Sequence, residues 1–309
     1  MVTYNQTGQD NGAGVDDTLF LKMYGGEVLA SYNASNIMEQ YHIIDTVTAG
    51  KSFQYPKIGR ATAQYWDGAT ELTGLNINQS EVTIELNDLL IHDMYIREID
   101  ELRDHVSKRG EYARQQGEAI AIQFDQGVLR QGVLASREAA TVTGTEAGTE
   151  ITDADSDTNG ASLAASIYTA ATAMDDKFVP ADGRRCFVKP AQYHLLAQTT
   201  DVINKDWSGE GSYARGLVHA VADIDIVKTT NLPQADDTAN TAIPANQRAD
   251  FSNTTALIMR DDAVRSVKLL GMKTEMDYKT EFQGTHMVAK MYTGTGVNRP
   301  ESAVSVKTA

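Results

Sequence analysis

An acidic loop in the middle of the chain has the residue types and the spacing of a metal site. Residues 155–160 read Asp-Ser-Asp-Thr-Asn-Gly, which places side-chain oxygens at positions one, three and five of a calcium loop and glycine at position six. The twelfth position is Ser166, where such a loop needs a bidentate glutamate. We therefore favour an acidic turn in which Asn159 or Ser162 caps the next helix.

Two carboxylates form a second candidate for chemistry. Asp223 and Asp225 lie two residues apart in a predicted strand, so both side chains would lie on one face, as a general acid–base pair requires. Ile224 and Ile226 alternate with them, and a half-exposed strand produces this pattern without any catalytic role. We favour that structural explanation, and a hydrolase built on this pair is the alternative.

The other residue types that support catalysis or metal binding are scattered. The six histidines form no His-x-x-x-His pair and lie away from the single cysteine, Cys186, which we expect to be a buried apolar residue. The sequence has no Gly-x-Ser-x-Gly elbow and no Walker loop. We predict no catalytic residue, no metal ligand and no cofactor, and therefore no enzyme.

The composition narrows the class of protein. The 309 residues are 41% hydrophobic and 22% charged, which is typical of a globular chain. A net charge of −15 argues against binding to nucleic acid through its phosphates, which needs clustered lysine and arginine. Residues 1–14 lack the features of a signal peptide, and no apolar run approaches the roughly 18 residues of a membrane span. We expect a protein made in the cytoplasm and used there or in a particle built there.

The elements that must hold these residues begin with a helix and a hairpin. Residues 1–17 read as a flexible arm, and apolar spacing predicts a helix over Thr18–Asn33. From about Gly50 to Leu90 the pattern indicates strand, because apolar and polar residues alternate at 52–55 and again at 81–87. Between these runs lies Asp67-Gly68, a pair that favours a tight turn because glycine accepts positive φ. The predicted helix face contains Leu19, Met23, Val28 and Leu29, and the predicted hairpin face contains Phe53, Tyr55, Val82, Ile84 and Leu86.

The length of this hairpin is the main indication of assembly. About 16 residues per strand at about 3.3 Å per residue give an arm of roughly 50 Å. A compact chain of this size has a radius of gyration of only about 19 Å. An isolated two-stranded ribbon is marginally stable in water. We therefore expect the hairpin to lie on another subunit, and a chain without residues 56–82 to stay soluble but not to assemble.

The rest of the chain reads as mixed helix and strand. A long helix is predicted over Asp104–Leu134, because Ile120, Phe124 and Val128 recur every four residues, and residues 136–160 read as a loop. The other expected elements are helices at Ser162–Met174 and Pro190–Gln198, strands at Arg184–Val188, Val221–Val227, Thr255–Met259, Met287–Tyr292 and Ala303–Lys307, a strand containing Met276, Tyr278 and Phe282, and a loop at Gln234–Asp250.

Five blocks of sequence carry a resemblance to a known family. They are Leu19–Leu29, Gly50–Arg60, residues 88–125 with Glu111-Tyr112, Gly117-Glu118 and Phe124-Asp125, Lys177–Pro180, and Arg299–Ala303. Each block resembles the corresponding region of the major capsid proteins of short-tailed bacteriophages, the podoviruses of the autographivirus type. The blocks keep the family's order, and the departures fall in residues 1–17, 136–160 and 234–250.

The resemblance implies an α+β chain with the tailed-phage major capsid fold, or Johnson fold. The implied parts are an N-terminal arm and short helix at 1–49, an extended hairpin loop at 50–90, a peripheral domain with a long spine helix at 91–159, an axial domain at 160–258, and return strands of the peripheral domain at 259–309. The expected subunit-interface residues of the hairpin are Lys51, Phe53, Tyr55, Lys57, Arg60, Trp66, Glu71, Glu81 and Glu85, and those singled out in the spine helix are Arg109, Ile120, Phe124 and Val128. For the charged residues of the hairpin, a solvated ribbon whose charges pair across it is an equal alternative.

The function that the resemblance implies is structural. The chain would be a subunit of an icosahedral capsid, assembled in the host cytoplasm into hexamers and pentamers with a scaffolding protein and with a portal protein at one vertex. The virion would enclose packaged double-stranded DNA without sequence-specific binding and without a membrane. An encapsulin-type nanocompartment shell protein is the first alternative, and a calcium-dependent virion surface protein is the second.

Overall fold

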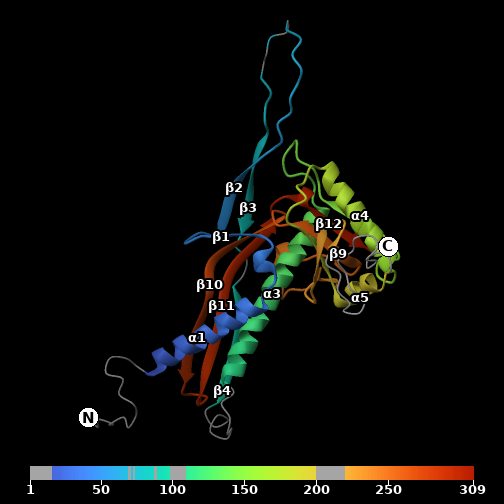
Figure 1. Ribbon diagram of the computed structural model, residues 1–309. Helices are drawn as coiled ribbons and strands as arrows, with labels where there is room; N and C mark the ends of the chain where they lie inside the picture. The colour runs from blue at the N-terminus through green and yellow to red at the C-terminus, as the bar shows by residue number, and fades with distance from the viewer. Residues whose placement is uncertain (1–15, 69–70, 72–73, 87–88, 98–108, 200–219) are drawn as a thin grey trace, which may run out of the picture. The chain divides into compact units, whose positions relative to one another are not determined.

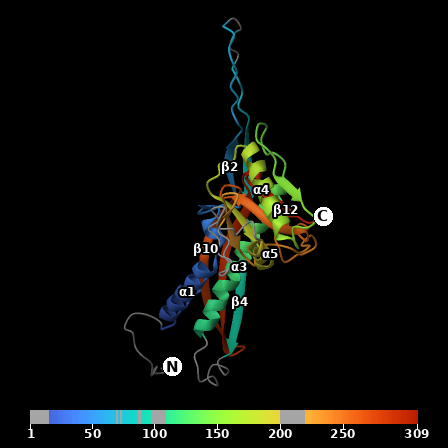
Figure 2. The same ribbon diagram turned by 45° about the vertical axis from the view of Figure 1, so that its right-hand side comes forward.

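The computed structural model describes the chain outside residues 1–15, 69–70, 72–73, 87–88, 98–108 and 200–219. The chain divides into two compact units, and helices and strands are mixed, as the sequence predicts (Figures 1 and 2). Unit 1 comprises Met1–Asn36, Leu89–Ala121 and Gly271–Met291, and unit 2 comprises Ile37–Asp88, Ile122–Leu270 and Tyr292–Ala309. Helix α3 (Arg109–Arg137) and strands β10 (Val264–Lys279) and β11 (Gly284–Val297) contribute residues to both units.

In unit 1, helix α1 (Asp16–Ser35) packs through a stripe of large residues. Tyr24, Val28 and Tyr32 are buried, and because they are four residues apart they lie on one side of the helix. The Tyr24 hydroxyl donates a 2.6 Å hydrogen bond to the side-chain oxygen of Gln116 on α3. A buried tyrosine needs such a partner for its hydroxyl, so the contact fixes both the packing and the polar end of the ring.

The face that the sequence predicts for this helix is wrong at two positions, because Met23 and Leu29 are exposed. The prediction relied on the spacing of the aliphatic residues, whereas two of the three residues in the buried stripe are tyrosines. Strand β4 (Leu90–Arg97) pairs antiparallel with β11 in the same unit, with Leu90 opposite Met291 and Arg97 opposite Gly284.

Close packing of α1 against the first half of α3 depends on Gly117. A Cβ atom at this position would lie 2.8 Å from the Ser31 Cβ and 2.9 Å from the Tyr32 amide nitrogen. We expect Gly117→Ala to lower the free energy of unfolding by about 1–3 kcal/mol, because overpacking outweighs the better helix propensity of alanine. Gly26→Ala is the matched control, since nothing lies within 4 Å of its Cβ, and it should stabilise by up to about 1 kcal/mol. Urea denaturation of both variants measures the contrast, and effects of the same sign would contradict it.

Unit 2 is built on a six-stranded sheet with the strand order β5-β12-β9-β6-β8-β7. The interior strand β12 pairs parallel with β5 and antiparallel with β9, and β9 pairs antiparallel with β6. Strands β9 and β12 are buried along nearly their whole length, which suits their largely apolar residues. The bounds are Thr149–Thr152 for β5, Arg184–Val188 for β6, Ala220–Val221 for β7, Ile224–Lys228 for β8, Thr254–Arg260 for β9 and Ala303–Lys307 for β12.

Helices α4 (Gly160–Asp176) and α5 (Pro190–Gln198) pack against this sheet (Figures 1 and 2). Leu163, Ile167 and Leu196 are fully buried in the core that the helices share with β6, β8, β9 and β12. Cys186 lies in the same core, as expected, and burial raises its pKa to about 12, so the thiol is an inert apolar group.

Two sequence predictions in unit 2 need correction. The stretch 136–160 is not only a loop, because it contains β5, whose pairing with β12 could not be read from local composition. The predicted strand Val221–Val227 is broken into β7 and β8 by a two-residue turn. Ala222 and Asp223 occupy the turn with φ values of 54° and 61°, which is the geometry of a type I′ hairpin turn.

Fewer residues of the extended hairpin are paired as β-strands than the sequence predicts. Strand β2 (Ser52–Ile58) pairs antiparallel with β3 (Gln79–Glu85) over seven residues per strand. The described residues from 59 to 78 belong to no strand and continue from β2 and β3 as a narrow loop (Figure 1). This segment is rich in Gly, Ala, Thr and Asn and lacks the apolar alternation that strand pairing needs. The longest strands are instead β10 and β11, with 16 and 14 residues.

The remaining described elements are strand β1 and three 3₁₀ helices. Strand β1 pairs parallel with the beginning of β10, and the four-stranded sheet has the order β1-β10-β11-β4. The bounds are Ile43–Thr46 for β1, and Met38–Gln40, Ala245–Gln247 and Pro300–Ser302 for the 3₁₀ helices η1, η4 and η5.

Candidate assembly interface

The base of the extended hairpin consists of strands β2 and β3. These strands attach to unit 2 the loop that we expect to contact a neighbouring subunit. Tyr55 of β2 and Ile84 of β3 are buried together with Val267 of β10. Phe53 lies opposite Ile84 and Tyr55 opposite Val82, which confirms the apolar face predicted for the hairpin. The base is therefore part of the core of unit 2.

Two glycines of β11 let the hairpin approach closely. A Cβ atom at Gly294 would lie 2.9 Å from the Leu86 Cα, and one at Gly296 would lie 3.0 Å from the Ile84 Cγ1. This role of the two glycines was not predicted, although a Gly-x-Gly pair inside a strand is the usual signal of a close approach by another backbone.

Lys57, which the sequence assigned to a subunit interface, is buried beneath the hairpin. Its ammonium donates hydrogen bonds to the Thr141 hydroxyl and, at 2.8 Å, to the Asn298 carbonyl oxygen. It also lies 3.9 Å from a Glu301 carboxylate oxygen. Burial lowers the pKa of Lys57, and the charge of Glu301 works against this decrease. These contacts join β2 to two distant segments of unit 2.

Glu301 extends this contact into a network of charges. The Arg299 guanidinium lies 2.9 Å from Glu301 and 2.9 Å from Asp262, and Arg260 lies 2.7 Å from the same Asp262 carboxylate. Burial favours a lower pKa for Arg299, but its hydrogen bond to Glu301 and the charge of Asp262 outweigh burial, so the pKa of Arg299 is raised. A buried carboxylate needs such partners because an unpaired buried charge is costly.

Arg60 continues the attachment just beyond β2. Its guanidinium carbon lies 4.0 Å from the centroid of the Phe178 ring, the geometry of a cation–π contact. Phe178 is 71% exposed and has a φ of 58°, a strained conformation for a residue other than glycine. The Gly59 amide donates a 2.8 Å hydrogen bond to the Asn78 carbonyl oxygen, which closes the base of the loop.

Beyond the base, the hairpin presents apolar side chains to solvent, and neighbouring exposed apolar groups mark an interaction surface. We call this surface the loop surface; its exposed apolar residues are Ile58, Tyr65, Trp66, Leu75 and Ile77. The charged residues predicted at the interface and found exposed are Lys51, Arg60, Glu71, Glu81 and Glu85. The predicted set is thus divided by burial: Tyr55 and Lys57 are buried, whereas Trp66 and these five charged residues are exposed.

The residues singled out in the spine helix are structural. Ile120, Phe124 and Val128 of α3 are at most 3% exposed, so the periodicity correctly located the buried face of this helix. Arg109 begins α3, and its side chain lies outside the described residues.

The acidic loop is a helix cap. The side chain of Asn159 accepts a 3.0 Å hydrogen bond from the Ala161 amide, which confirms the capping interpretation. The Ser162 and Ser166 hydroxyls each donate a 2.7 Å hydrogen bond to the Asp153 carboxylate. In the part of the chain that the structure describes, no group of three or more His, Cys, Asp or Glu side chains could hold a metal ion.

The paired-carboxylate hypothesis is wrong in its geometry. Asp223 lies in the turn between β7 and β8, whereas Asp225 lies in β8, so the two residues do not alternate along one strand.

Among the described residues, no helix is long and apolar enough to cross a membrane.

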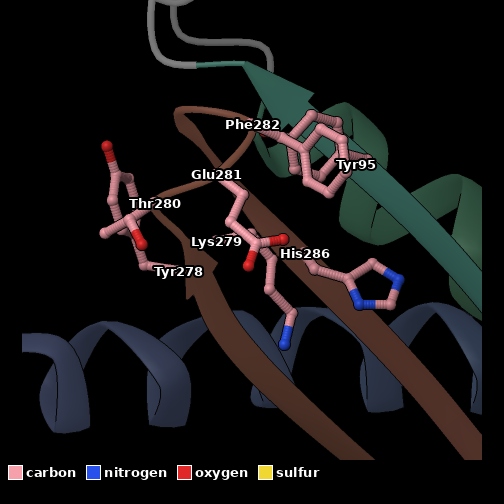
Figure 3. Close-up of a pocket in the computed structure, with 7 residues that line it drawn as sticks. All are labelled: Tyr95, Tyr278, Lys279, Thr280, Glu281, Phe282 and His286. Atoms are coloured by element: carbon pink, nitrogen blue, oxygen red, sulfur yellow. The ribbon is translucent and has the colours of Figure 1, made fainter.

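Unit 1 carries a second exposed apolar region at the turn between β10 and β11. Phe282, which was predicted to lie in a strand with Met276 and Tyr278, lies in this turn because β10 ends at Lys279. Figure 3 shows the rings of Tyr95 and Phe282 beside each other at a shallow pocket, which His286 also lines. The two rings meet edge to face, with centroids 6.2 Å apart, and Phe282 is 66% exposed. His286 lies 3.2 Å from the Asp93 carboxylate.

The comparison with protein families decides what kind of chain presents these surfaces. A family model described as "Gp10A-like: Major capsid protein" matches residues 54–307. The chain belongs to this family. It is similar to the major capsid protein of Enterobacteria phage T3, with 27% identity over 330 residues that cover 97% of this chain and 95% of that protein. The major capsid protein of Escherichia phage T7 is also 27% identical, over 336 residues that cover 97% and 96% of the two chains.

Solved capsid structures agree with this membership. The capsid structure of the cyanophage P-SCSP1u matches with a TM-score of 0.82 and 34% identity, covering 100% of this chain and 99% of that one. The mature capsid of bacteriophage PhiM1 matches with a TM-score of 0.75 at 15% identity, over 100% and 92% of the chains, which shows the shared fold.

The chain is therefore a phage major capsid protein with the tailed-phage capsid fold, a structural component of the virion, as the sequence resemblance predicted. Membership of this family supports the function of a phage capsid subunit and not the encapsulin-type alternative.

Proposed function

We propose that this capsid protein forms an icosahedral shell of hexamers and pentamers in which the loop surface of each subunit lies on a neighbouring subunit. The observation that carries the proposal is the exposure of Tyr65, Trp66, Leu75 and Ile77 on a segment without strand pairing of its own. Covering such a segment removes apolar area from water, which is favourable at about 25 cal/mol per Å².

The division of the hairpin residues supports distinct roles. Phe53, Tyr55 and Lys57 hold the base in unit 2. We assign the intersubunit contacts to the exposed members of the predicted set, namely Lys51, Arg60, Trp66, Glu71, Glu81 and Glu85. Individual exposed ion pairs contribute little, so many repeated contacts would have to add up to a stable closed shell.

The parts implied by the resemblance belong to the same proposal. They are the N-terminal arm at 1–49, the extended loop at 50–90, the peripheral domain at 91–159 with return strands at 259–309, and the axial domain at 160–258. Its partners would be a scaffolding protein during assembly, a portal protein at one vertex, and packaged double-stranded DNA held without sequence-specific contacts. A net charge of −15 suits a container that must not adhere to its contents. We propose no catalytic activity.

Electron cryomicroscopy of the expressed chain, alone and together with its candidate scaffolding protein, tests the proposal. The expected result is closed particles with fivefold and sixfold subunit clusters and with density for residues 59–78 on an adjacent subunit. Isolated subunits at high concentration in the presence of the scaffolding protein would contradict it, as would particles in which this loop contacts only its own subunit.

A further inference from the structure

The Asp125 carboxylate of α3 is a buried acid that the capsid architecture does not by itself explain. Its residue is fully buried, and within the described part of the chain no ion pair involves it. One of its oxygens accepts the Met38 amide at 3.1 Å, and the other accepts the Ile37 amide at 3.0 Å and the Asn231 side-chain amide at 3.3 Å. The carboxylate therefore holds the first two residues of unit 2 in place.

His42 holds the other side of the same turn. Its Nδ1 lies 2.6 Å from the Met38 carbonyl oxygen, and its Nε2 lies 2.8 Å from the Ser266 hydroxyl. A carbonyl oxygen only accepts hydrogen bonds, so Nδ1 carries the proton and Nε2 accepts from Ser266 while the ring is neutral. Burial lowers the pKa of His42 to about 4, which keeps the ring neutral above that pH.

The charged groups around Asp125 are few. Glu39 follows Met38 in the turn and repels a second negative charge, and Lys268 of β10 forms an ion pair with Glu39. Burial raises the pKa of Asp125 to about 6, although the amides of Ile37 and Met38 oppose the increase. The carboxylate can therefore change its charge under mildly acidic conditions.

We propose that Asp125 is a proton-operated clasp on residues 37–42. The charged carboxylate accepts both backbone amides. A protonated carboxyl has a hydroxyl group, which donates a hydrogen bond and no longer serves both amides as an acceptor. Uptake of a proton thus releases at least one of the Ile37 and Met38 amides, and loosens the turn that leads from the end of α1 into β1.

The global stability of the chain is a poor reporter of this clasp. The raised pKa of Asp125 means that its contribution to stability increases as the pH falls from about 6 towards its ordinary value of 3.8. The lowered pKa of His42 means that its contribution decreases as the pH falls from 6.5 to about 4. The two contributions oppose each other in the same range, so a local measurement is needed.

Hydrogen–deuterium exchange provides this local measurement. Exchange of the full chain is followed by mass spectrometry from pH 7.5 to pH 5 and corrected for intrinsic exchange rates. In the wild type we expect the protection of the peptide that contains Ile37 and Met38 to fall by about tenfold, because a hydrogen bond to a charged acceptor is lost. Asp125→Asn should abolish this pH dependence. Glu118→Gln, an exposed carboxylate change in the same helix, should leave it as in the wild type.

A second variant tests the direction of the effect. Asn231→Ala removes a donor that favours the charged form of Asp125, so the midpoint of the loss in protection should move to higher pH. A wild-type profile without pH dependence would overturn the proposal. So would the same fall in protection in Asp125→Asn, or an unchanged midpoint in Asn231→Ala.

Discussion

Replacement of residues 60–77 by Asn-Gly should give a folded, soluble chain that forms no closed shells. The two-residue turn would connect Gly59 to Asn78, which already share a backbone hydrogen bond, and Asn-Gly suits a tight hairpin turn. The change removes most of the loop surface and leaves β2, β3 and the buried base intact. Each 1.4 kcal/mol lost from an intersubunit contact weakens that contact tenfold, and a closed shell repeats the loss at every subunit.

Negative-stain microscopy and sedimentation measure this result, and circular dichroism checks the fold. The deletion of residues 56–82 considered from the sequence alone is a poorer test, because it removes Lys57 and part of β3 and would disturb the core of unit 2. A variant with Trp66→Ala only is the graded control and should assemble less efficiently than the wild type. Normal shells from the Asn-Gly variant would refute the intersubunit role of the loop.

Lys57→Met should lower the free energy of unfolding by about 3 kcal/mol, because it leaves the buried carboxylate of Glu301 with one cation fewer. The change also removes the hydrogen bonds to Thr141 and to the Asn298 carbonyl. Methionine retains a flexible apolar stem like that of lysine but lacks the terminal nitrogen, so the loss reports on the ammonium group. Urea denaturation of the unassembled chain gives the size of the effect.

The double variant Lys57→Met with Glu301→Gln separates electrostatics from packing. Removing both charges of a buried pair is much less destabilising than removing one, so the double variant should recover at least half of the lost stability. Arg299 retains Asp262 as a partner in this background. Equal stability of the single and the double variant would show that the charge of Glu301 plays no part.

Much of the fold could be predicted where the local pattern is strong. The bounds of β6, α5 and β12 agree with the sequence prediction, because Arg184–Val188 and Ala303–Lys307 are compact strand-forming runs and Pro190 marks a first helical turn. The beginning of β10 was missed because Val264–Lys279 mixes apolar and charged residues without a strict alternation. Tertiary pairing with β1 and β11, and not local propensity, specifies that strand.

Only part of the candidate interface could be predicted from the sequence, because some of its contacts join residues that are far apart in the chain. Alternation identified the inward face with Tyr55 and Ile84, but a lysine in a strand is ordinarily a solvent-exposed residue. The partners of Lys57 lie 84 and 241 residues further along the chain, and no local pattern contains that information. The burial of Asp125 is equally non-local, since Asn231 lies 106 residues away.

The position of β12 between β5 and β9 also has a consequence for synthesis. Residues 303–307 complete the sheet between β5 and β9, strands encoded well before them. A ribosome must therefore have synthesised residues 303–307 before this sheet can close, and until then β5 and β9 lack their shared partner. Such closure of long-range pairs delays folding, so a nascent subunit would not offer a finished binding surface to its neighbours before residues 303–307 have joined the sheet.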